Sequence, residues 1–497
     1  FPHVIVNQAR IHDYLIETMR FFASRAEVDY GWEVIGVEVA SGGDRPVSVR
    51  LRSADGANRT VRAKYVVGCD GARSAVRQAI GRQLKGDVAN HAWGVMDILA
   101  VTDFPDIRLK AAIQSANQGN VLLIPREGGY LCRVYVDLGA VAEDDHHRVR
   151  QTPVDEVIRR ANEILAPYTL DVKQVAWSSV YEVGHRVTDK FDDVAVTEEH
   201  DPRVFLAGDA CHTHSAKAGQ GMNVSMQDGF NLGWKLGSVL SGLSPASLLS
   251  TYTAERRPVA QQLIEFDKEW STLMARKPEE ISDPADLATY YLATAEFPSG
   301  FMTTYAEGTG VVAGTAHQHL ATGFPVGKRF KSAPVTLAAD GNVVHLGHHA
   351  KADGRWRLYA FADRDGLADD SPLARFAAWL LQDPGSPVRR HTPTDADIDA
   401  VFDAKVIYQQ GFDAIDVTRA PAIFRPRSGA LALTDWEKVF AAAPSRWNAV
   451  DIFDARGLSR DGVVVVVRPD QYVAAVLPLE ATDELADFFA RWMLPAA

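Results

Sequence analysis

The segment from Arg203 to Asn223 constrains the fold more than any other part of this 497-residue chain. It begins with the apolar run Val204–Ala207, which predicts a short buried strand, and continues with Gly208-Asp209. A carboxylate there lies just past the carboxyl end of a strand, where open parallel sheets bind ligands. Gly219 and Gly221 then precede a predicted helix, whose first N–H groups and positive dipole end suit an electron-rich ring. The segment predicts a strand–turn–helix unit that binds a polyhydroxylated cofactor, and an ordinary turn is the alternative.

A second segment of the same kind lies upstream. It is preceded by residues 8–26, in which the spacing of apolar residues predicts a helix. Tyr65–Gly68 predicts another short buried strand, which is followed by Asp70-Gly71 and by a helix beginning near Ser74. We expect the two short strands to share one sheet. Asp70 and Asp209 would then lie near the same cofactor.

The region between these two segments, about Arg82 to Phe191, changes character. Its predicted strands are Trp93–Val101, Lys110–Ser115, Asn120–Pro125 and Leu131–Leu138. Gly128-Gly129 predicts the turn of a hairpin. An antiparallel sheet inserted between two cofactor segments predicts a cover over a substrate.

The region that begins near His319 has its own pattern. Arg355–Phe361 alternates as a strand, and Ser371 is the expected N-cap of a helix that has Pro372 at its first position. A strand pair, Val463–Val467 and Tyr472–Leu477, precedes a last helix, for which Thr482 is the expected cap. No cysteine lies beyond Cys211, so we expect no thiol chemistry here.

The helix after Asp209 carries small residues at four-residue spacing: Ser225, Gly229, Gly233 and Gly237. Each glycine costs about 1 kcal/mol relative to alanine inside a helix. The spacing predicts a ridge that lets the helix backbone pack closely against a neighbour.

Composition narrows the class of protein. Hydrophobic residues make up 46% of the chain, which suits a sizeable core, and no apolar run is long enough to span a membrane. The net charge of −12 argues against nucleic acid and anionic membranes as partners. Three cysteines without C-x-x-C pairing suit the reducing cytoplasm.

These motifs resemble those of a known family. The segment around Gly208-Asp209 is similar to the GD motif, and Tyr65–Ser74 to the DG motif, of the aromatic-ring hydroxylases that use FAD and NAD(P)H. Asn231–Leu236, Tyr252–Ala260 and Gly462–Leu477 extend the resemblance over nearly the whole chain. In that family a Gly-x-Gly-x-x-Gly fingerprint comes first. Its absence, with Phe1 as the first residue, predicts an N-terminally truncated piece, and whether such a piece holds flavin by itself stays open.

The resemblance implies a multidomain α/β and α+β fold. An incomplete Rossmann-like FAD domain would carry an inserted antiparallel-sheet substrate domain and be followed by a thioredoxin-like C-terminal domain. The expected bounds are 1–85 with 192–316 for the FAD domain, 86–191 for the substrate sheet and 317–497 for the C-terminal domain. The last would be structural or form a homodimer.

The resemblance also implies site residues. The expected FAD contacts are Gln8, Asp70, Arg73, Gly208, Asp209, Gly219, Gly221, Met222 and Asn223. On the inserted sheet, Lys110 would bind a substrate carboxylate beside the hydroxyl of Tyr135, although solvent-facing positions are the alternative. Ala216 stands where relatives usually have proline, in the loop that would line the flavin. His212 and His214 could suggest a metal, but we expect none.

The expected activity is hydroxylation of a phenolic ring ortho to its hydroxyl, with FAD, O2 and NADPH. The expected substrate is 3-hydroxybenzoate, converted to a dihydroxybenzoate, and hydroxylation of phenol is the alternative. Two other interpretations remain: another FAD enzyme on the same scaffold, or a non-catalytic dimerisation protein with a dead flavin site.

Overall fold

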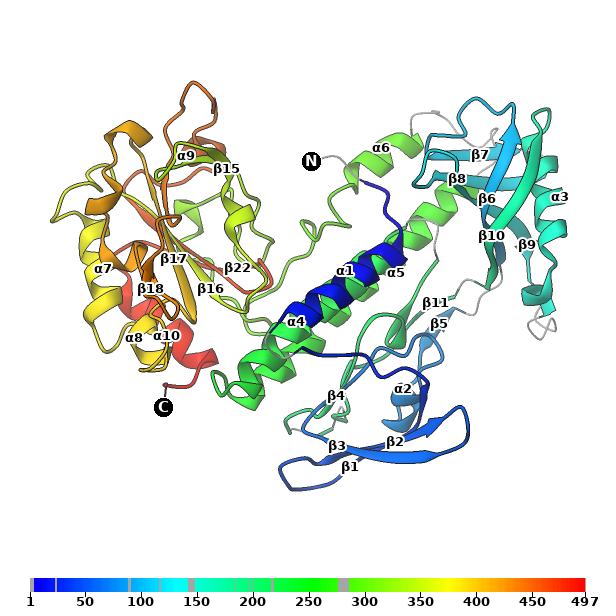
Figure 1. Cartoon of the computed structure of the whole chain (residues 1–497), viewed down its shortest axis with the longest axis horizontal. Coiled ribbons are helices and arrows are strands. Elements are labelled where there is room, and N and C mark those ends of the chain that lie inside the picture. Colours follow the sequence, from blue (N-terminus) through cyan, green and yellow to red (C-terminus); the bar gives the residue numbers. More distant parts are fainter. Residues whose placement is uncertain are drawn as a thin grey trace. The chain divides into compact units, whose positions relative to one another are not determined.

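The structure, a computed structural model, describes residues 4–22, 25–87, 91–115, 118–141, 148–182, 184–195, 197–198, 200–215, 219–275 and 286–496. The chain divides into two compact units (Figure 1). The first comprises Phe1–Asp193, Arg203–Met222 and Ala260–Thr294, and the second comprises Val194–Pro202, Asn223–Val259 and Ala295–Ala497. No helix among the described residues combines the length and the apolar character that crossing a membrane requires.

The two short strands of the first unit pair as the sequence predicts. β4 (Val66–Gly68) and β12 (Val204–Leu206) are parallel, with Val66 opposite Val204 and Gly68 opposite Leu206. Parallel neighbours end at the same edge of a sheet, so the segments carrying Asp70 and Asp209 leave the sheet side by side. A short three-stranded sheet has the order β13-β11-β5. Its strands are β13 (His212–Thr213), β11 (His185–Val187) and β5 (Lys85–Asp87).

The N-terminal part of the first unit is mostly exposed. α1 (Gln8–Phe21) has no buried residue, and it is shorter than the expected helix because Phe22 already adopts an extended conformation. An antiparallel sheet of β1 (Trp32–Val39), β2 (Val47–Ser53) and β3 (Asn58–Ala63) follows. α2 (Ala75–Ala79) begins after Ser74, whose side chain accepts a hydrogen bond from the N–H of Arg77 and thus caps the helix.

The inserted region forms the expected antiparallel sheet, with the strand order β10-β6-β9-β8-β7. Its strands are β6 (His91–Thr102), β7 (Ala111–Ser115), β8 (Gly119–Pro125), β9 (Cys132–Ala140) and β10 (Leu170–Glu182). α3 (Val154–Leu165) covers one face, where Ile164 joins a core with Met96 and Val134 (Figure 1). Side chains alternate between the faces of a strand, so the residues between these core positions point to the other face.

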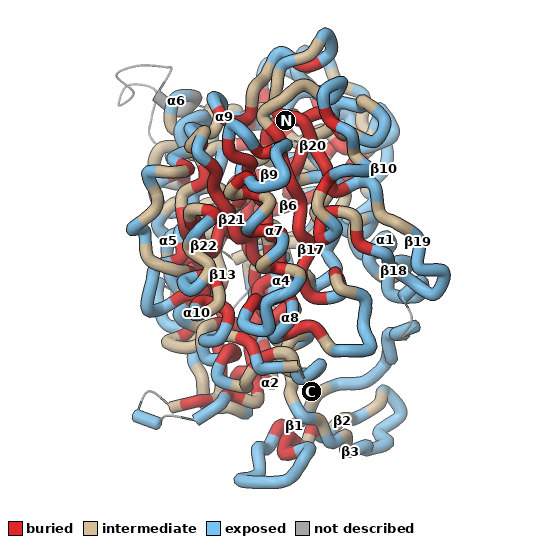
Figure 2. Tube along the Cα trace, turned by 90° about the vertical axis from the view of Figure 1, so that its left-hand side faces the viewer, coloured by how far each residue is buried: buried red, intermediate tan, exposed pale blue. Residues whose placement is uncertain are grey.

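The second unit is built around a seven-stranded sheet with the order β15-β14-β20-β17-β16-β21-β22. The strands are β14 (Pro334–Leu337), β15 (Val343–His345), β16 (Trp356–Phe361), β17 (Phe402–Tyr408), β20 (Val439–Ala441), β21 (Val463–Val467) and β22 (Val473–Leu477). β16 and β17 are parallel, whereas β21 and β22 form an antiparallel hairpin next to β16. The strands β16, β17 and β21 have buried side chains throughout, and β17 and β21 are red in Figure 2.

Helices α7 (Pro372–Gln382) and α10 (Thr482–Trp492) contribute Phe376 and Phe489 to the main core of this unit. Ser371 caps α7 as predicted, because its side chain accepts a hydrogen bond from the N–H of Ala374. The expected cap at Thr482 is wrong. Thr482 is already the first residue of α10, and the helix has no side-chain capping bond. The remaining short helices and strands of this unit are α8 (Pro387–His391), α9 (Ile452–Ala455), β18 (Arg427–Ser428) and β19 (Leu433–Thr434), whereas α6 (Asp286–Ala293) belongs to the first unit.

Two long helices, α4 (Gly221–Leu240) and α5 (Thr251–Ala275), each have residues in both units. The predicted glycine ridge of α4 does not pack against a neighbour. Gly229, Gly233 and Gly237 are exposed, and a Cβ added at any of them would meet no described atom within 4 Å. The buried face of α4 is the opposite one, where Asn231 and Lys235 lie. The sequence prediction failed because larger side chains, both polar and apolar, make the buried contacts of α4.

Candidate functional site

Asp209 stands out at the edge of the β4–β12 pair. Its neighbours Gly208 and Ala210 are buried, whereas Asp209 is exposed. The end of a buried strand thus presents one carboxylate away from the core. A carboxylate held in this way suits hydrogen bonds from the hydroxyl groups of a sugar or ribityl chain.

The start of α4, at Gly221, depends on two glycines. Gly219 has φ +69°, a left-handed conformation that favours glycine. A Cβ at Gly221 would lie 2.8 Å from the ring of His214, so a larger residue there would displace that ring. The first N–H groups of a helix have no acceptor within the helix, so a helix start suits an electron-rich group.

These features fit FAD. Asp209, Gly219, Gly221 and Met222 belong to the same unit, and Asn223 continues the same helix. The exposed carboxylate suits the ribityl hydroxyls, and the helix start suits the ring edge that becomes negative on reduction. Ala216, which was expected to line the flavin, lies outside the described residues.

A buried hydrogen-bond network holds the segment before α4. Asp267 of α5 accepts hydrogen bonds from the N–H and the hydroxyl of Ser215, both at 2.6 Å, and it also contacts Nε2 of His185 at 2.8 Å. The carbonyl of Ser215 lies 2.7 Å from Nδ1 of His214. Burial lowers the pKa of His214, which favours the neutral ring. The network therefore fixes the imidazole that packs on Gly221.

The two predicted residues of the DG motif have different environments. Asp70 accepts hydrogen bonds from the hydroxyl of Ser74 and, at 3.1 Å, from the N–H of Val76, so it helps to cap α2. Arg73 is exposed. The residue that connects the two motifs is Arg77, which no sequence pattern had revealed. Its guanidinium donates to the carbonyls of Ala72 and Ala210, both at 2.9 Å.

Gln8 is exposed in the first turn of α1. Gln8 and Asp209 were both predicted to contact FAD, and between these two described residues the structure gives no hydrogen bond. The neighbouring residue, Asn7, caps α1 and donates to Glu127 at 2.5 Å. The predicted flavin contact of Gln8 therefore stays a prediction.

The face of the five-stranded sheet opposite α3 carries polar and aromatic side chains. Asp97 accepts two hydrogen bonds from Arg133, at 2.7 and 2.8 Å, and lies 3.6 Å from Arg126. The guanidinium of Arg133 also lies 5.2 Å from the ring centre of Trp177. Burial would lower the pKa of Arg133, but Asp97 and Tyr135 outweigh it and raise that pKa.

Tyr135 lies on this face, because it follows Arg133 by two positions in β9. Burial and the nearby Tyr135 raise the pKa of Tyr181, which lies on β10. Lys110 is exposed and directly precedes β7, two positions before Ala112. Ala112 is opposite Leu122, and Leu122 is opposite Tyr135. The spacing therefore puts Lys110 on the side of the sheet that carries Tyr135, two strands away.

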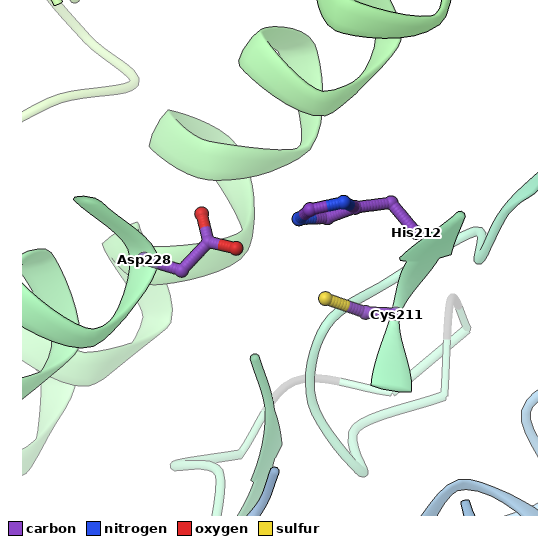
Figure 3. A group of neighbouring side chains, drawn as sticks. All are labelled: Cys211, His212 and Asp228. Carbon is purple, nitrogen blue, oxygen red and sulfur yellow. The ribbon is translucent and has the colours of Figure 1, made fainter. Parts of the chain in front are cut away.

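Figure 3 draws Cys211, His212 and Asp228. Cys211 and His212 are buried in the first unit, and the carbonyl of Cys211 accepts a hydrogen bond from the N–H of Thr188. Asp228 belongs to the second unit, where its carboxylate accepts a hydrogen bond from Arg256 at 2.7 Å. This charge-assisted hydrogen bond compensates the buried carboxylate without a metal. The expected absence of a metal stays a prediction.

Comparisons with known proteins show the family of this chain. The family described as "FAD binding domain" matches residues 3–267, more than half of the chain. The family described as "Phenol hydroxylase, C-terminal dimerisation domain" matches residues 301–497. The chain belongs to the FAD-dependent aromatic hydroxylases. It is therefore an enzyme, an FAD-dependent monooxygenase of the oxidoreductase class.

Individual relatives cover nearly the whole chain. A 3-hydroxybenzoate 4-monooxygenase of Comamonas testosteroni is 50% identical over 99% of this chain and 79% of its own length. A phenol 2-monooxygenase of Aspergillus fumigatus is 35% identical over 86% of this chain and 70% of its own. Among solved structures, an anhydrotetracycline hydroxylase from Streptomyces rimosus is 23% identical, with a TM-score of 0.64 over 99% of this chain and 81% of its own. This last likeness concerns the fold alone.

Proposed function

We propose that this hydroxylase converts 3-hydroxybenzoate to a dihydroxybenzoate, with NADPH as the electron donor. The observation that carries the proposal is the polar, aromatic face of the five-stranded sheet around Tyr135. The similarity of the whole chain to a 3-hydroxybenzoate 4-monooxygenase supports the choice of substrate. One atom of O2 would enter the ring ortho to the hydroxyl group, and the other would leave as water with the two electrons from NADPH.

In this proposal the chain's own residues bind and orient the reactants. Asp209 holds the ribityl hydroxyls of FAD, and the N–H groups of Gly221, Met222 and Asn223 face the flavin ring. Asp70 and Arg73 complete the cofactor site, with Gln8 near the ring. Bound FAD supplies the redox chemistry. The protein's further task is to keep water away from the reacting atoms.

On the substrate side, we propose that Lys110 binds the carboxylate and that Tyr135 contacts the phenolic end. A carboxylate that leaves water needs a charged partner. Arg133 is a poor candidate because Asp97 already takes two of its hydrogen bonds.

Phenol is the second candidate substrate, and a specific observation favours it. Two arginines, Arg126 and Arg133, face two carboxylates, Asp97 and Glu127. This balance leaves no net positive charge among the four side chains. If Lys110 does not reach the substrate, an uncharged phenol suits the face better than a benzoate.

The test is coupled consumption of NADPH and O2 with each compound, with the product identified by chromatography. We expect 3-hydroxybenzoate to stimulate NADPH oxidation more than phenol does. Lys110→Met should raise KM for the benzoate far more than KM for phenol. A wild-type preference for phenol would contradict the carboxylate proposal and favour the second candidate.

We also propose that residues 317–497 form a thioredoxin-like domain that supports a homodimer. The parallel pair β16–β17, joined through α7, and the β21–β22 hairpin followed by α10 support this assignment. The expected FAD domain, 1–85 with 192–316, and substrate domain, 86–191, likewise remain proposals.

A further inference from the structure

Arg256 of α5 is completely buried, and its guanidinium contacts the first two turns of α4. Nε donates to the carboxylate of Asp228 at 2.7 Å, and Nη2 lies 3.4 Å from the carbonyl of Val224. Nη1 donates to the hydroxyl of Tyr305 at 2.9 Å. All of these residues belong to the second unit. One arginine thus links the beginning of α4 to α5 and to Tyr305.

The position of these contacts in α4 matters. The helix begins at Gly221, and the N–H groups of its first four residues have no acceptor within the helix. Val224 is the last of these four residues. The segment that Arg256 contacts is therefore continuous with the N–H groups that we assign to the flavin ring. A shift of this turn would move those groups together.

We propose that Arg256 is a positioning residue for the flavin, acting through Asp228 and Val224 on the first turn of α4. This inference rests on the proposed placement of the flavin ring at the start of α4. It goes further, because it names a residue of α5 that sets how the helix meets the ring.

Arg468 offers a matched control. It is 1% exposed, and it donates to Glu255 at 2.6 and 2.8 Å and to Asp470 at 2.7 Å. Its loss also leaves buried carboxylates without their arginine, but among the described residues none of its hydrogen bonds reaches the first two turns of α4. Arg256→Met and Arg468→Met should therefore both destabilise the fold, while only the first should change the flavin site.

The experiment compares the two variants in the full protein. Three measurements are made: the dissociation constant for FAD, the flavin midpoint potential, and hydrogen exchange of residues 221–224 without FAD. For Arg256→Met we expect weaker FAD binding by about tenfold, which corresponds to about 1.4 kcal/mol. We also expect faster exchange and a lower potential, because a displaced helix dipole stabilises the reduced ring less well. Arg468→Met should leave the dissociation constant and the potential near the wild-type values.

Equal changes in the two variants would overturn the inference, since they would report only a loss of stability. Unchanged FAD affinity and potential in Arg256→Met would overturn it too. If Arg256→Met does not fold, Asp228→Asn keeps the side-chain shape and should give the same changes in exchange and potential. Asp209→Ala distinguishes a failure of this inference from a failure of the proposed function. Unchanged FAD binding in Asp209→Ala would contradict the proposed flavin site, but it would not contradict the contact of Arg256 with α4.

Discussion

Two groups of charged residues in this enzyme differ in their exposure to solvent. On the five-stranded sheet, Arg133 pairs with Asp97 while 22% and 10% of their side chains are exposed, and the guanidinium lies over the ring of Trp177. In the second unit, Arg468 pairs with Glu255, and their side chains are 0% and 1% exposed. The first arrangement leaves surface for a ligand. The second is closed by its own partners, so we assign the pair of Arg468 with Glu255 to stability, whereas Arg256 and Asp228 of the same group also hold the start of α4.

The closed group is balanced in charge. It comprises three cations and three carboxylates: Lys235, Arg256, Arg468, Asp228, Glu255 and Asp470. Removing one member of a buried pair leaves an uncompensated charge, which costs far more than losing an exposed pair. Removing a carboxylate should therefore cost more stability in the buried group of the second unit than on the five-stranded sheet.

The largest expected effect is that of Glu255→Gln. Glu255 accepts hydrogen bonds from Arg468 and, at 2.7 Å, from Lys235, so the substitution leaves two buried cations without this carboxylate. We expect the free energy of unfolding to fall by about 3–5 kcal/mol. Denaturant unfolding followed by circular dichroism measures it. A loss below about 1 kcal/mol, typical of exposed pairs, would break the comparison.

The same carboxylate predicts a dependence on pH. Burial would raise the pKa of Glu255, but Arg468 and Lys235 outweigh burial and hold that pKa well below its ordinary 4.5. The folded state then binds fewer protons than the unfolded state, so this stabilisation is present above pH 4.5 and is lost as the pH falls below it. Unfolding measured from about pH 7 to about pH 3, the range in which such carboxylates titrate, should show a steeper loss in the wild type than in Glu255→Gln. Parallel curves would contradict this assignment.

A smaller effect is expected at the exposed carboxylate of the first unit. Asp209→Ala should weaken FAD binding by about 1–3 kcal/mol, the cost of a lost charged hydrogen bond. Fluorescence titration with FAD measures it, and Asp201→Ala, at another exposed aspartate, is the control. If Asp209→Ala keeps the wild-type affinity, the site is placed wrongly.

The smallest effect concerns substrate preference. Asp97→Asn removes the negative charge that faces Arg133 and Arg126, so the face becomes more positive. We expect KM for 3-hydroxybenzoate to fall a few-fold relative to KM for phenol. Steady-state kinetics with both compounds measure the ratio. An unchanged ratio would show that this face does not contact the carboxylate.

Local features of the fold could be predicted from the sequence. The strands β4 and β12 and the cap at Ser371 depend on neighbouring residues, and a short pattern reveals them. Thr482 shows the limit, because the helix begins one residue earlier than the cap pattern suggests.

The charged contacts could not be predicted in this way. Arg468 and Glu255 are 213 positions apart, and no local period connects them. Arg77 was missed for a similar reason: its partner Ala210 is 133 positions away. The glycine spacing of α4 led to a wrong prediction, because such spacing does not show which face of the helix is buried.

The most direct test of the central comparison is to measure two quantities in Asp97→Asn and Glu255→Gln side by side. These are the free energy of unfolding and the affinities for 3-hydroxybenzoate and phenol, followed through the flavin absorbance. We predict that Asp97→Asn changes the relative affinities with the smaller loss of stability, and that Glu255→Gln loses stability with the relative affinities unchanged. The opposite result, altered preference in Glu255→Gln and none in Asp97→Asn, would contradict the assignment of the Arg133–Asp97 pair to the substrate and of the Arg468–Glu255 pair to the fold.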